Sequence, residues 1–298
     1  MPPKIIITGA FGQLGSDCMQ LLSDHYIIIA CSHSMLDIGK PKKSQKTLAD
    51  FRPDIIINCA AYTQVDDCEI REEHAYQINA KGPGYLARYA HLSGAKLIHI
   101  STDYVFDGSL PVPNGYEETD TPNPVSVYGK SKYAGEQAII SETDRFVILR
   151  TAWLFGINGH NFLKTIFRLA ISEKQPPLKV INTQYGSFTH TLDLARQIHR
   201  LIVADAQGIY HASGEGYCTW YDGARHFLNA MGIQKDIQPC TEQEFPTKAI
   251  RPKNSILNNC RLKKENIHIM PNWQDGINAF VTLFKKEAGD VTAYQTLI

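Results

Sequence analysis

Short apolar runs of strand length alternate with amphipathic segments through the first half of the chain, and this alternation restricts the possible folds most. The runs are rich in β-branched residues and cover 4–8, 26–30, 54–58, 96–101 and 146–150. Segments with helical patterning lie between them, at 12–23, 44–52, 71–93 and 126–142. Buried parallel strands read as continuous apolar runs, and parallel neighbours need a crossover helix. The pattern therefore predicts an α/β fold, a Rossmann-like doubly wound parallel sheet.

The regular alternation ends after residue 150. Prolines interrupt the second half, and its remaining patterns are helical at 161–172, 191–204 and 219–231 and strand-like at 178–181 and 208–212. A chain of 298 residues has room for about two domains. We expect residues 1–150 to form the sheet domain, with a return to it around 187–210, and residues 151–298 to form mainly a smaller, interleaved α/β lobe.

Charge and cysteine content exclude several classes of protein. Lysine and arginine total 30, as do aspartate and glutamate, so the net charge is zero and a general nucleic-acid or anionic-membrane binder is not expected. No apolar run approaches the ~20 residues that span a bilayer, and the first residues lack a signal-peptide core. The seven cysteines include no C-x-x-C pair, which argues against disulfides and a zinc cluster. We expect a reduced, cytoplasmic protein with no metal site.

A glycine-rich turn follows the first predicted strand directly. Gly9, Gly12 and Gly15 are spaced as G-x-x-G-x-x-G, and the predicted helix at 12–23 begins inside the turn. Glycines let the backbone turn tightly and approach a pyrophosphate, which the free N–H groups of a helix N-terminus then bind. The position between strand and helix favours a dinucleotide site over a turn needed only for helix–sheet packing. The sheet domain is therefore predicted to bind NAD(P), and the following lobe to bind the substrate.

The end of the second predicted strand bears on the choice of cofactor. A carboxylate there would bind the 2′-hydroxyl of an adenosine ribose, but this chain reads Cys31-Ser-His-Ser34 and has no acid before Asp37. The missing carboxylate removes repulsion against a 2′-phosphate, to which Ser32 or His33 can donate. Lysines are close in sequence, at 40, 42 and 43. These features favour NADPH and leave NADH open.

A tyrosine and a lysine four residues apart form a candidate catalytic pair. Tyr128 and Lys132 lie in the predicted helix at 126–142, so both project from one face, about 6 Å apart along the axis. An ammonium beside a phenol lowers the pKa of the phenol, which can then serve as a general acid or base. Thr102 stands at the carboxyl end of the fourth predicted strand, where open α/β sheets bind ligands. It can hydrogen-bond a substrate oxygen that Tyr128 protonates; otherwise it only caps the strand, and Tyr128 is a packed helix residue.

Several motifs, in their order along the chain, resemble one family. They are Gly9-x-x-Gly12-x-x-Gly15, Asn58-Cys-Ala-Ala-Tyr-Thr63-x-Val-Asp66, Ser101-Thr-Asp-Tyr-Val-Phe-Asp-Gly108, Tyr128-Gly-Lys-Ser-Lys132, Arg150-Thr-Ala-Trp-Leu-Phe-Gly156, Asn161-Phe, Val180-Ile-Asn-Thr-Gln-Tyr-Gly186-Ser and Arg251-Pro-Lys-Asn-Ser255. The set resembles the extended short-chain dehydrogenase/reductases and, within them, the dTDP-4-dehydrorhamnose reductases. The resemblance implies an oxidoreductase that uses NAD(P)H to reduce the C4 keto group of dTDP-4-dehydro-β-L-rhamnose. The product would be dTDP-L-rhamnose, a nucleotide sugar for polysaccharide biosynthesis.

The resemblance also implies a role for each matching residue. Thr102 would orient the keto oxygen, Tyr128 would protonate it, and Lys132 would hold the nicotinamide ribose and lower the pKa of Tyr128. The implied cofactor contacts, besides Tyr128 and Lys132, are Gly9, Phe11, Gly12, Gln13, Leu14, Ser32, Asp37, Ile38, Ala60, Ala61, Tyr62 and Thr63. The implied substrate contacts, besides Thr102, are Asp103, Tyr104, Trp153, Asn161 and Arg251. Arg251 is our own assignment to the diphosphate, because a guanidinium binds a dianion with two hydrogen bonds; core packing of Trp153 and surface exposure of Arg251 are the alternatives.

The chain departs from the family's pattern at several points. The acid near the end of the second strand is missing, and Phe188 stands where the family has a proline. Some members dimerise around magnesium through glutamates that we cannot place here, so we expect no magnesium-bridged dimer and leave monomer and homodimer open. A related dehydratase is disfavoured, because Tyr104 occupies the position of its glutamate. Another nucleotide-sugar reductase or epimerase, and a non-catalytic regulatory subunit with this fold, remain alternatives.

Overall fold

The central sheet has six parallel strands in the spatial order β10-β5-β4-β3-β1-β2. Their bounds are β1 Lys4–Thr8, β2 Ile27–Cys31, β3 Ile55–Asn58, β4 Lys96–Thr102, β5 Phe146–Thr151 and β10 Gly208–His211. The computed structural model describes residues 2–172 and 177–288, so the parts of the predicted lobe at 173–176 and 289–298 lie outside the described residues, as does residue 1. The predicted Rossmann-like α/β sheet is confirmed.

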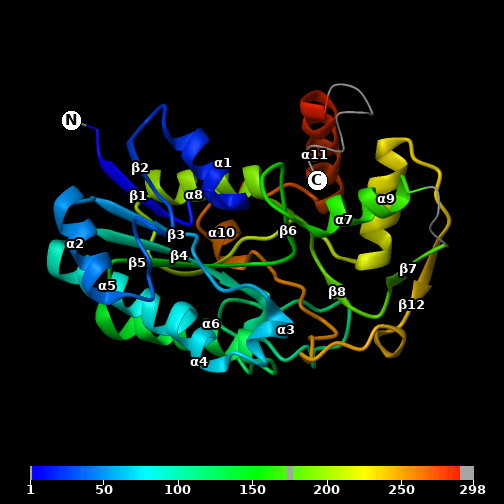
Figure 1. Cartoon of the computed structure of the whole chain (residues 1–298), viewed down its shortest axis with the longest axis horizontal. Coiled ribbons are helices and arrows are strands. Elements are labelled where there is room, and N and C mark those ends of the chain that lie inside the picture. The colour runs from blue at the N-terminus through cyan, green and yellow to red at the C-terminus, as the bar shows by residue number, and fades with distance from the viewer. Residues whose placement is uncertain (1, 173–176, 289–298) are drawn as a thin grey trace.

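Helices cover both faces of this sheet (Figure 1). On one face, α1 (Gln13–Leu22) and α8 (Thr191–Val203) pack on Ile5 and Ile7. On the other face, Ile6 packs in a core with side chains of α2 (Pro41–Phe51), α5 (Gly82–Ser93) and α6 (Val127–Glu142). Successive side chains of a strand point to opposite faces. A strand covered on both sides is therefore apolar throughout, as the sequence pattern indicates.

The helix expected at 71–93 consists of three consecutive pieces. They are α4 (Glu72–Tyr76), a π-helical turn η1 (Gln77–Lys81) and α5. The π-helical turn holds Asn79, whose Oδ1 accepts from the Tyr62 amide at 2.8 Å and whose Nδ2 donates to the Tyr62 carbonyl at 3.0 Å. Turns of this kind are frequent at functional sites. Here the turn fixes the loop that follows β3.

The second lobe is made of small two-stranded sheets and helices. The strand pairs are β7 (Leu178–Ile181) with β12 (Ile237–Cys240), β8 (Tyr185–Gly186) with β11 (Cys218–Thr219), and β6 (Leu154–Phe155) with β9 (Thr189–His190). The helices are α7 (Phe162–Ala170), α9 (Trp220–Met231) and α11 (Trp273–Ala288), whereas the short α10 (Cys260–Lys264) packs on the central sheet through Leu262. The lobe is interleaved with the sheet, because α8 and β10 lie between β9 and β11 along the chain.

Helix α11 and strand β12 were not predicted. The prolines between 239 and 271 indicated irregular structure, but Pro271 lies just before α11 and Pro239 lies within the short pair formed with β7. Ile277, Phe280 and Phe284 are buried at helical spacing, so the apolar pattern of α11 was present and was outweighed by the prolines. In the described part of the chain, no helix is long and apolar enough to cross a membrane.

Candidate active site

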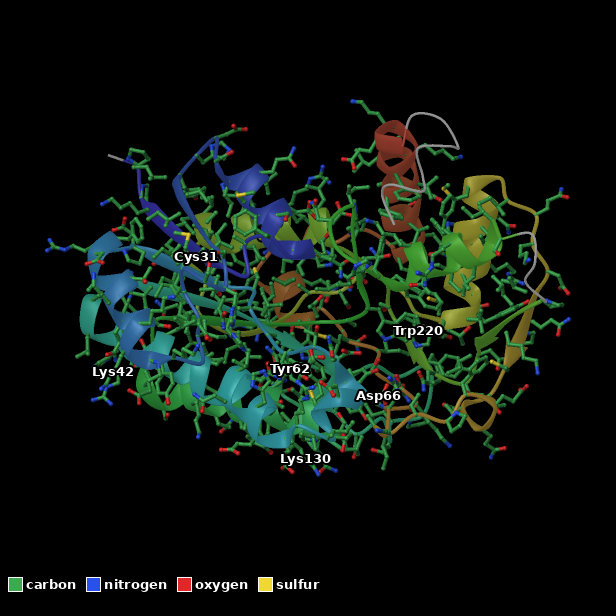
Figure 2. The ribbon with its side chains drawn as sticks, viewed as in Figure 1. Cys31, Lys42, Tyr62, Asp66, Lys130 and Trp220 are labelled. Atoms are coloured by element: carbon green, nitrogen blue, oxygen red, sulfur yellow. The ribbon has the colours of Figure 1, made fainter. Side chains whose placement is uncertain are left out.

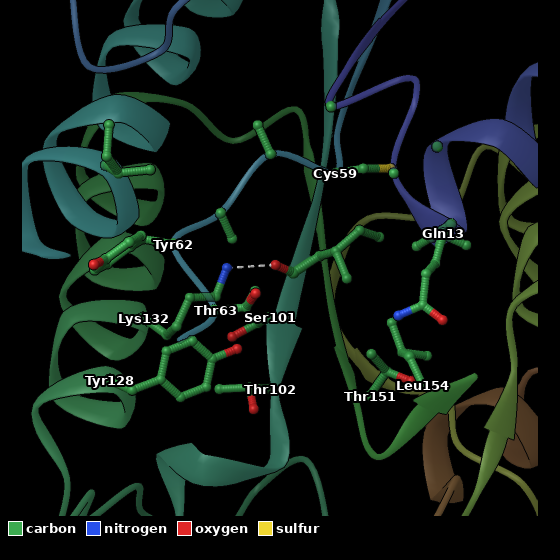
Figure 3. A pocket seen from close by; sticks show the side chains of 18 of the residues that line it. Gln13, Cys59, Tyr62, Thr63, Ser101, Thr102, Tyr128, Lys132, Thr151 and Leu154 are labelled. Atoms are coloured by element: carbon green, nitrogen blue, oxygen red, sulfur yellow. Dashed lines mark hydrogen bonds between the residues drawn. The ribbon is translucent and has the colours of Figure 1, made fainter. Parts of the chain in front are cut away.

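A cavity of about 650 Å³ lies at the carboxyl ends of the central strands, against the second lobe (Figure 3). Open α/β sheets bind their ligands at this edge. Most of the residues predicted to bind cofactor or substrate line the cavity. They are Gly9, Gly12, Gln13, Leu14, Asp37, Ile38, Ala60, Ala61, Tyr62, Thr63, Thr102, Asp103, Tyr104, Tyr128, Lys132 and Trp153.

Four residues on the predicted list are not among those that line the cavity: Phe11, Ser32, Asn161 and Arg251. Phe11 stands on the glycine turn with 65% of its surface exposed. Ser32 is hydrogen-bonded to a neighbouring serine hydroxyl at 2.8 Å. Asn161 caps α7 and donates to Gln13 Oε1 at 3.2 Å, so it holds a lining residue from outside. The surroundings of Arg251 are described with the substrate side of the cavity below.

The three glycines of the turn differ in what they do. Gly9 has a φ of 64°, and a Cβ on Gly15 would lie 2.2 Å from the Gly9 carbonyl oxygen, so backbone geometry alone requires glycine at both positions. Gly12 is the N-cap of α1, whose first turn carries no acidic side chain. Free amides at such an N-terminus attract an anion. Backbone packing therefore accounts for glycine at Gly9 and Gly15, whereas a Cβ on Gly12 would meet its nearest atom at 3.3 Å, so packing restricts that position less.

A buried polar row crosses the strand ends beside the cavity. β1, β3 and β4 are in register there, so Thr8 lies opposite Asn58, and Asn58 lies opposite His99. Thr8 Oγ1 is 2.6 Å from Asn58 Oδ1, and Asn58 Nδ2 is 2.9 Å from His99 Nδ1. His99 Nε2 is 3.2 Å from Lys132 Nζ, which also donates to the Ile100 carbonyl at 2.6 Å. The row thereby fixes the position of the Lys132 ammonium (Figure 3).

Burial changes how this row titrates. Desolvation lowers the pKa of Lys132 to about 8, although the carboxylate of Glu136 opposes the change. Desolvation, together with the charge of Lys132, holds the pKa of His99 well below its usual value. His99 is therefore neutral and can accept a hydrogen bond from the ammonium.

Tyr128 and Thr102 lie side by side among the residues that line the cavity (Figure 3). Tyr128 lies in the first turn of α6, where the Ser126 hydroxyl caps the helix by accepting from the Gly129 amide at 3.1 Å. The Thr102 hydroxyl lies near the Tyr128 phenol. Burial raises the pKa of Tyr128 well above its usual value, and the neighbouring Thr102 hydroxyl opposes the change.

Burial dominates the pKa of Tyr128 in this structure, and the lowering of this pKa by Lys132 stays a prediction. Desolvation of the phenol is the largest influence on its pKa, and the Lys132 ammonium is directed at Ile100 and His99 instead. Tyr128 therefore keeps its proton at neutral pH. A group that protonates an alkoxide must hold its proton in this way.

Charged side chains also gather near Thr102 on the side of the second lobe. Asp103 accepts from Thr102 Oγ1 at 3.0 Å, and burial raises the pKa of this carboxyl to about 6. Arg251 Nη2 is 2.7 Å from Asp66 Oδ2, and the guanidinium also lies beside the Tyr104 phenol. Asp66 belongs to α3 (Val65–Cys68), so the ion pair joins the first domain to the C-terminal segment. Within residues 2–172 and 177–288, no group of three or more His, Cys, Asp or Glu side chains could hold a metal ion.

Two aromatic residues line the cavity without having been singled out in the sequence. The His74 ring packs edge-on against Tyr62, with centroids 4.8 Å apart. The Trp220 indole stacks on Trp153, with centroids 3.8 Å apart and ring planes 14° apart. Both residues reach the cavity from helices whose local sequence carries no recognisable motif. Trp220 follows the Thr219 N-cap of α9, which identifies a helix start and gives no indication of a cavity.

Known proteins resemble the chain over nearly its whole length. The family model described as "RmlD substrate binding domain" matches residues 3–286. A dTDP-4-dehydrorhamnose reductase of Aggregatibacter actinomycetemcomitans is 38% identical over 275 residues, which are 88% of this chain and 92% of the relative. The spore coat polysaccharide biosynthesis protein SpsK of Bacillus subtilis is 37% identical over 279 residues, 93% of this chain and 96% of SpsK.

A solved structure gives the same result. The crystal structure of dTDP-4-dehydrorhamnose reductase from Bacillus anthracis in complex with NADP superimposes with a TM-score of 0.91 at 39% identity, and the match covers 95% of this chain and 100% of that one. The resemblance noted in the sequence motifs is thereby confirmed. The chain belongs to the RmlD substrate binding domain family, together with these dTDP-4-dehydrorhamnose reductases.

Proposed function

We propose that the chain reduces the C4 keto group of dTDP-4-dehydro-β-L-rhamnose to dTDP-L-rhamnose, with NADPH as the reductant. One observation carries the proposal: the Thr102 and Tyr128 hydroxyls share a single cavity with Lys132 and the glycine turn. A hydride donor and a proton donor can therefore meet at one carbonyl group. Membership of a family with relatives named for this reaction supports the same conclusion.

The reduction adds a hydride to C4 and a proton to the C4 oxygen. A bound nicotinamide cofactor supplies the hydride. Thr102 and Tyr128 would both donate hydrogen bonds to the keto oxygen, and Tyr128 would transfer its proton as the C4–H bond forms. Burial keeps Tyr128 protonated before the reaction, and the nearby Lys132 ammonium would stabilise the phenolate that remains.

The first domain fits a nicotinamide dinucleotide. The N-terminus of α1 at Gly12 would bind the pyrophosphate, and Lys132 would bind the nicotinamide ribose. Phe11, exposed on the turn, would lie over the dinucleotide. The remaining proposed contacts are Gly9, Gln13, Leu14, Asp37, Ile38, Ala60, Ala61, Tyr62 and Thr63, all of which line the cavity.

The surroundings of Asp37 favour NADPH over NADH. Asp37 Oδ1 accepts from the Gly39 amide at 3.0 Å, and Asp37 Oδ2 is 3.4 Å from Lys40 Nζ and 3.5 Å from His33 Nε2. The carboxylate is therefore already paired with cationic or donor groups. A 2′-phosphate at this end of the cavity would meet His33, Lys40 and the Ser32 hydroxyl. We propose Ser32 as a donor to it.

The second lobe would bind the sugar nucleotide. Asp103, Tyr104 and Trp153 line the cavity on that side, and Arg251, next to Tyr104, would exchange Asp66 for the diphosphate. Asn161 would act through Gln13, because its amide holds that side chain. We accordingly propose residues 1–150 as the cofactor domain and residues 151–298, apart from the return to the sheet, as the substrate lobe.

The test is to supply enzymatically generated dTDP-4-dehydro-β-L-rhamnose with NADPH or NADH. We expect one equivalent of NADPH to be oxidised for each dTDP-L-rhamnose formed, and NADPH to be used in preference to NADH. Folded protein that oxidises no cofactor above background contradicts the proposal. Tightly retained NAD without net consumption would indicate an epimerase instead.

A further inference from the structure

Trp153 has an unusual backbone conformation for a large side chain. Its φ is 44°, in the left-handed region that non-glycine residues rarely adopt, and its side chain lines the cavity. Such a conformation is unfavourable for a residue with a Cβ and persists only where the surroundings enforce it. Residues held in this way are concentrated at ligand sites. The side chains that enforce it are therefore informative about function.

The surroundings of Trp153 come from separate parts of the second lobe. Trp220 stacks flat on its ring at 3.8 Å, and Phe188 packs edge-on at 5.2 Å. A Cβ at Gly186 would lie 2.6 Å from the Trp153 ring, so the glycine admits the indole. Phe188, which stands where the family has proline, also packs edge-on against Trp220 at 5.2 Å. The departure from the family pattern thus contributes to the stack.

Trp220 is itself fixed at its polar end. Its Nε1 donates to Gln184 Oε1 at 3.2 Å, and Gln184 is only 4% exposed. Trp220, labelled in Figure 2, is the first residue of α9 and lies between Thr219 and Asp222, which form the capping box of that helix. Burying an indole N–H requires a partner, and Gln184 satisfies this requirement. Both the position and the rotation of the Trp220 ring are therefore set by the protein.

The indole pair stands beside the reacting group. β4 and β5 are in register at Thr102 and Thr151, and Trp153 follows two residues later. Trp153 therefore lies just past the end of β5, on the strand next to the one that carries Thr102. Ala152 and Leu154 line the same part of the cavity and add only apolar surface. This wall therefore faces the sugar, near the carbon that is reduced.

We propose that Trp220 is a positioning residue, which holds Trp153 as an apolar wall that selects 6-deoxy sugars. The inference rests on the proposed function and deepens it. A C6 methyl group would gain contact with the indole, whereas a C6 hydroxyl placed there would lose its water without finding a partner. Trp220 acts through the ring plane of Trp153.

The test measures binding without turnover. dTDP-β-L-rhamnose and dTDP-β-L-mannose differ only in the oxygen on C6, and calorimetry in the presence of NADP⁺ compares them on the whole chain. We expect the unaltered protein to bind the 6-deoxy ligand at least about tenfold more tightly. Trp220→Leu should lose most of this preference while its affinity for NADPH alone stays unchanged.

Trp273→Phe is the matched control, because it removes an indole from the lobe core and leaves the Trp153–Trp220 pair in place. Near-ultraviolet circular dichroism should lose the signal of two coupled indoles in Trp220→Leu and keep it in Trp273→Phe. A Trp220→Leu protein that lacks this signal but retains the original ligand preference overturns the inference.

If Trp220→Leu does not fold, the Trp220→Phe variant tests the inference in its place. It keeps a ring against Trp153 and loses the hydrogen bond to Gln184, so an intermediate preference is expected, and an unchanged preference overturns the inference. The outcome is separable from that of the reaction itself. If the protein prefers the 6-deoxy ligand but oxidises no NADPH, the proposed reaction is contradicted. The proposed role of Trp220 then still holds.

Discussion

The sheet-side wall of the cavity and the wall formed by the second lobe position their side chains by different means. On the sheet side, Thr102 and Lys132 are fixed by strand register and by hydrogen bonds that run along neighbouring strand ends. On the lobe side, Trp153 and Trp220 are fixed by ring stacking between segments that lie far apart in the sequence. The first wall suits charge and proton transfer, which need defined donors. The second suits shape selection, which needs rigid apolar area.

This difference explains what each wall tolerates. A polar row within a buried sheet fails when one member is lost, because its partners are then left unsatisfied. When one ring of a stacked wall is made smaller, the wall loses only part of its contact area. Such a substitution should change the selectivity for the substrate before it changes the rate of turnover. Substitutions on the sheet side should therefore affect turnover most strongly, and substitutions on the lobe side should affect substrate affinity.

The largest expected effect is that of Tyr128→Phe. Removing the proton donor should lower kcat by about a thousandfold, within the range known for general acids, while NADPH binding remains nearly intact. Tyr133→Phe, on the same helix but outside the residues that line the cavity, is the matched control and should keep its turnover. Single-turnover kinetics with a separate NADPH titration distinguishes the two effects. Near-normal turnover in Tyr128→Phe would show that another group donates the proton.

The glycine turn offers a comparison within the sheet-side wall. Gly15→Ala should destabilise the fold by about 2 kcal/mol or more, because the new Cβ would lie 2.2 Å from a carbonyl oxygen. Gly12→Ala meets its nearest atom at 3.3 Å, so it should fold and chiefly weaken NADPH binding. Chemical denaturation and cofactor titration of both variants check this. Equal loss of stability in the two would mean that Gly12 also serves packing alone.

On the lobe side, Arg251→Ala should raise the KM for the sugar nucleotide by about tenfold or more and leave the affinity for NADPH unchanged, since a charge-assisted contact to the diphosphate is lost. Arg251→Lys should recover only part of the loss, because an ammonium cannot form the two-pronged contact. Steady-state kinetics with each substrate varied in turn measures both. A KM that is unchanged in Arg251→Ala would leave Arg251 with only its ion pair to Asp66.

A smaller effect is expected from pH. Lys132 has its pKa lowered by burial to about 8, so the ammonium proposed to bind the ribose is lost above that pH, and NADPH affinity should fall severalfold between pH 7 and about 9.5. The free energy of unfolding should change in the opposite direction and increase over the same rise in pH. The pKa of Lys132 is below the ordinary lysine value, so between the two the unfolded chain binds more protons, and the contribution of Lys132 to the free energy of unfolding rises with pH.

Lys132→Arg provides the control for this prediction, because a guanidinium keeps its charge throughout the range. Its NADPH affinity should be flat over the same pH interval, even if it is weaker overall. A fall of equal size in Lys132→Arg would assign the pH dependence to another group.

The sequence predicts the sheet-side wall well and the lobe-side wall poorly, for a physical reason. Gly12, Thr102 and Tyr128 occupy local motifs next to predicted strands and helices, and parallel strands place their carboxyl ends at one edge. The Trp153–Trp220 stack depends on the path of irregular segments between short strands, which no local period encodes. Helix α11 lies where the prolines indicated irregular structure, although Ile277 and Phe280 recur there at helical spacing and are buried.

Electrostatics limited the prediction in a second way. The four-residue spacing of Tyr128 and Lys132 predicts their proximity correctly, but the spacing does not contain the burial that raises the pKa of Tyr128. The spacing also gives no indication of His99, which strand register places close enough to Lys132 to accept a hydrogen bond from its ammonium. Local spacing gives the partners, and the direction of a pKa shift requires the packed structure.

The most direct test of the account is to follow the hydride. NADPH carrying deuterium at the transferred position of its nicotinamide should place one deuterium on C4 of dTDP-L-rhamnose, which mass spectrometry and NMR of the product can locate. The account predicts that the unaltered chain transfers one deuterium to C4 of each product molecule. Over the same time, Tyr128→Phe should form almost no labelled product. Product formed without deuterium at C4, or label found at another carbon, would contradict it.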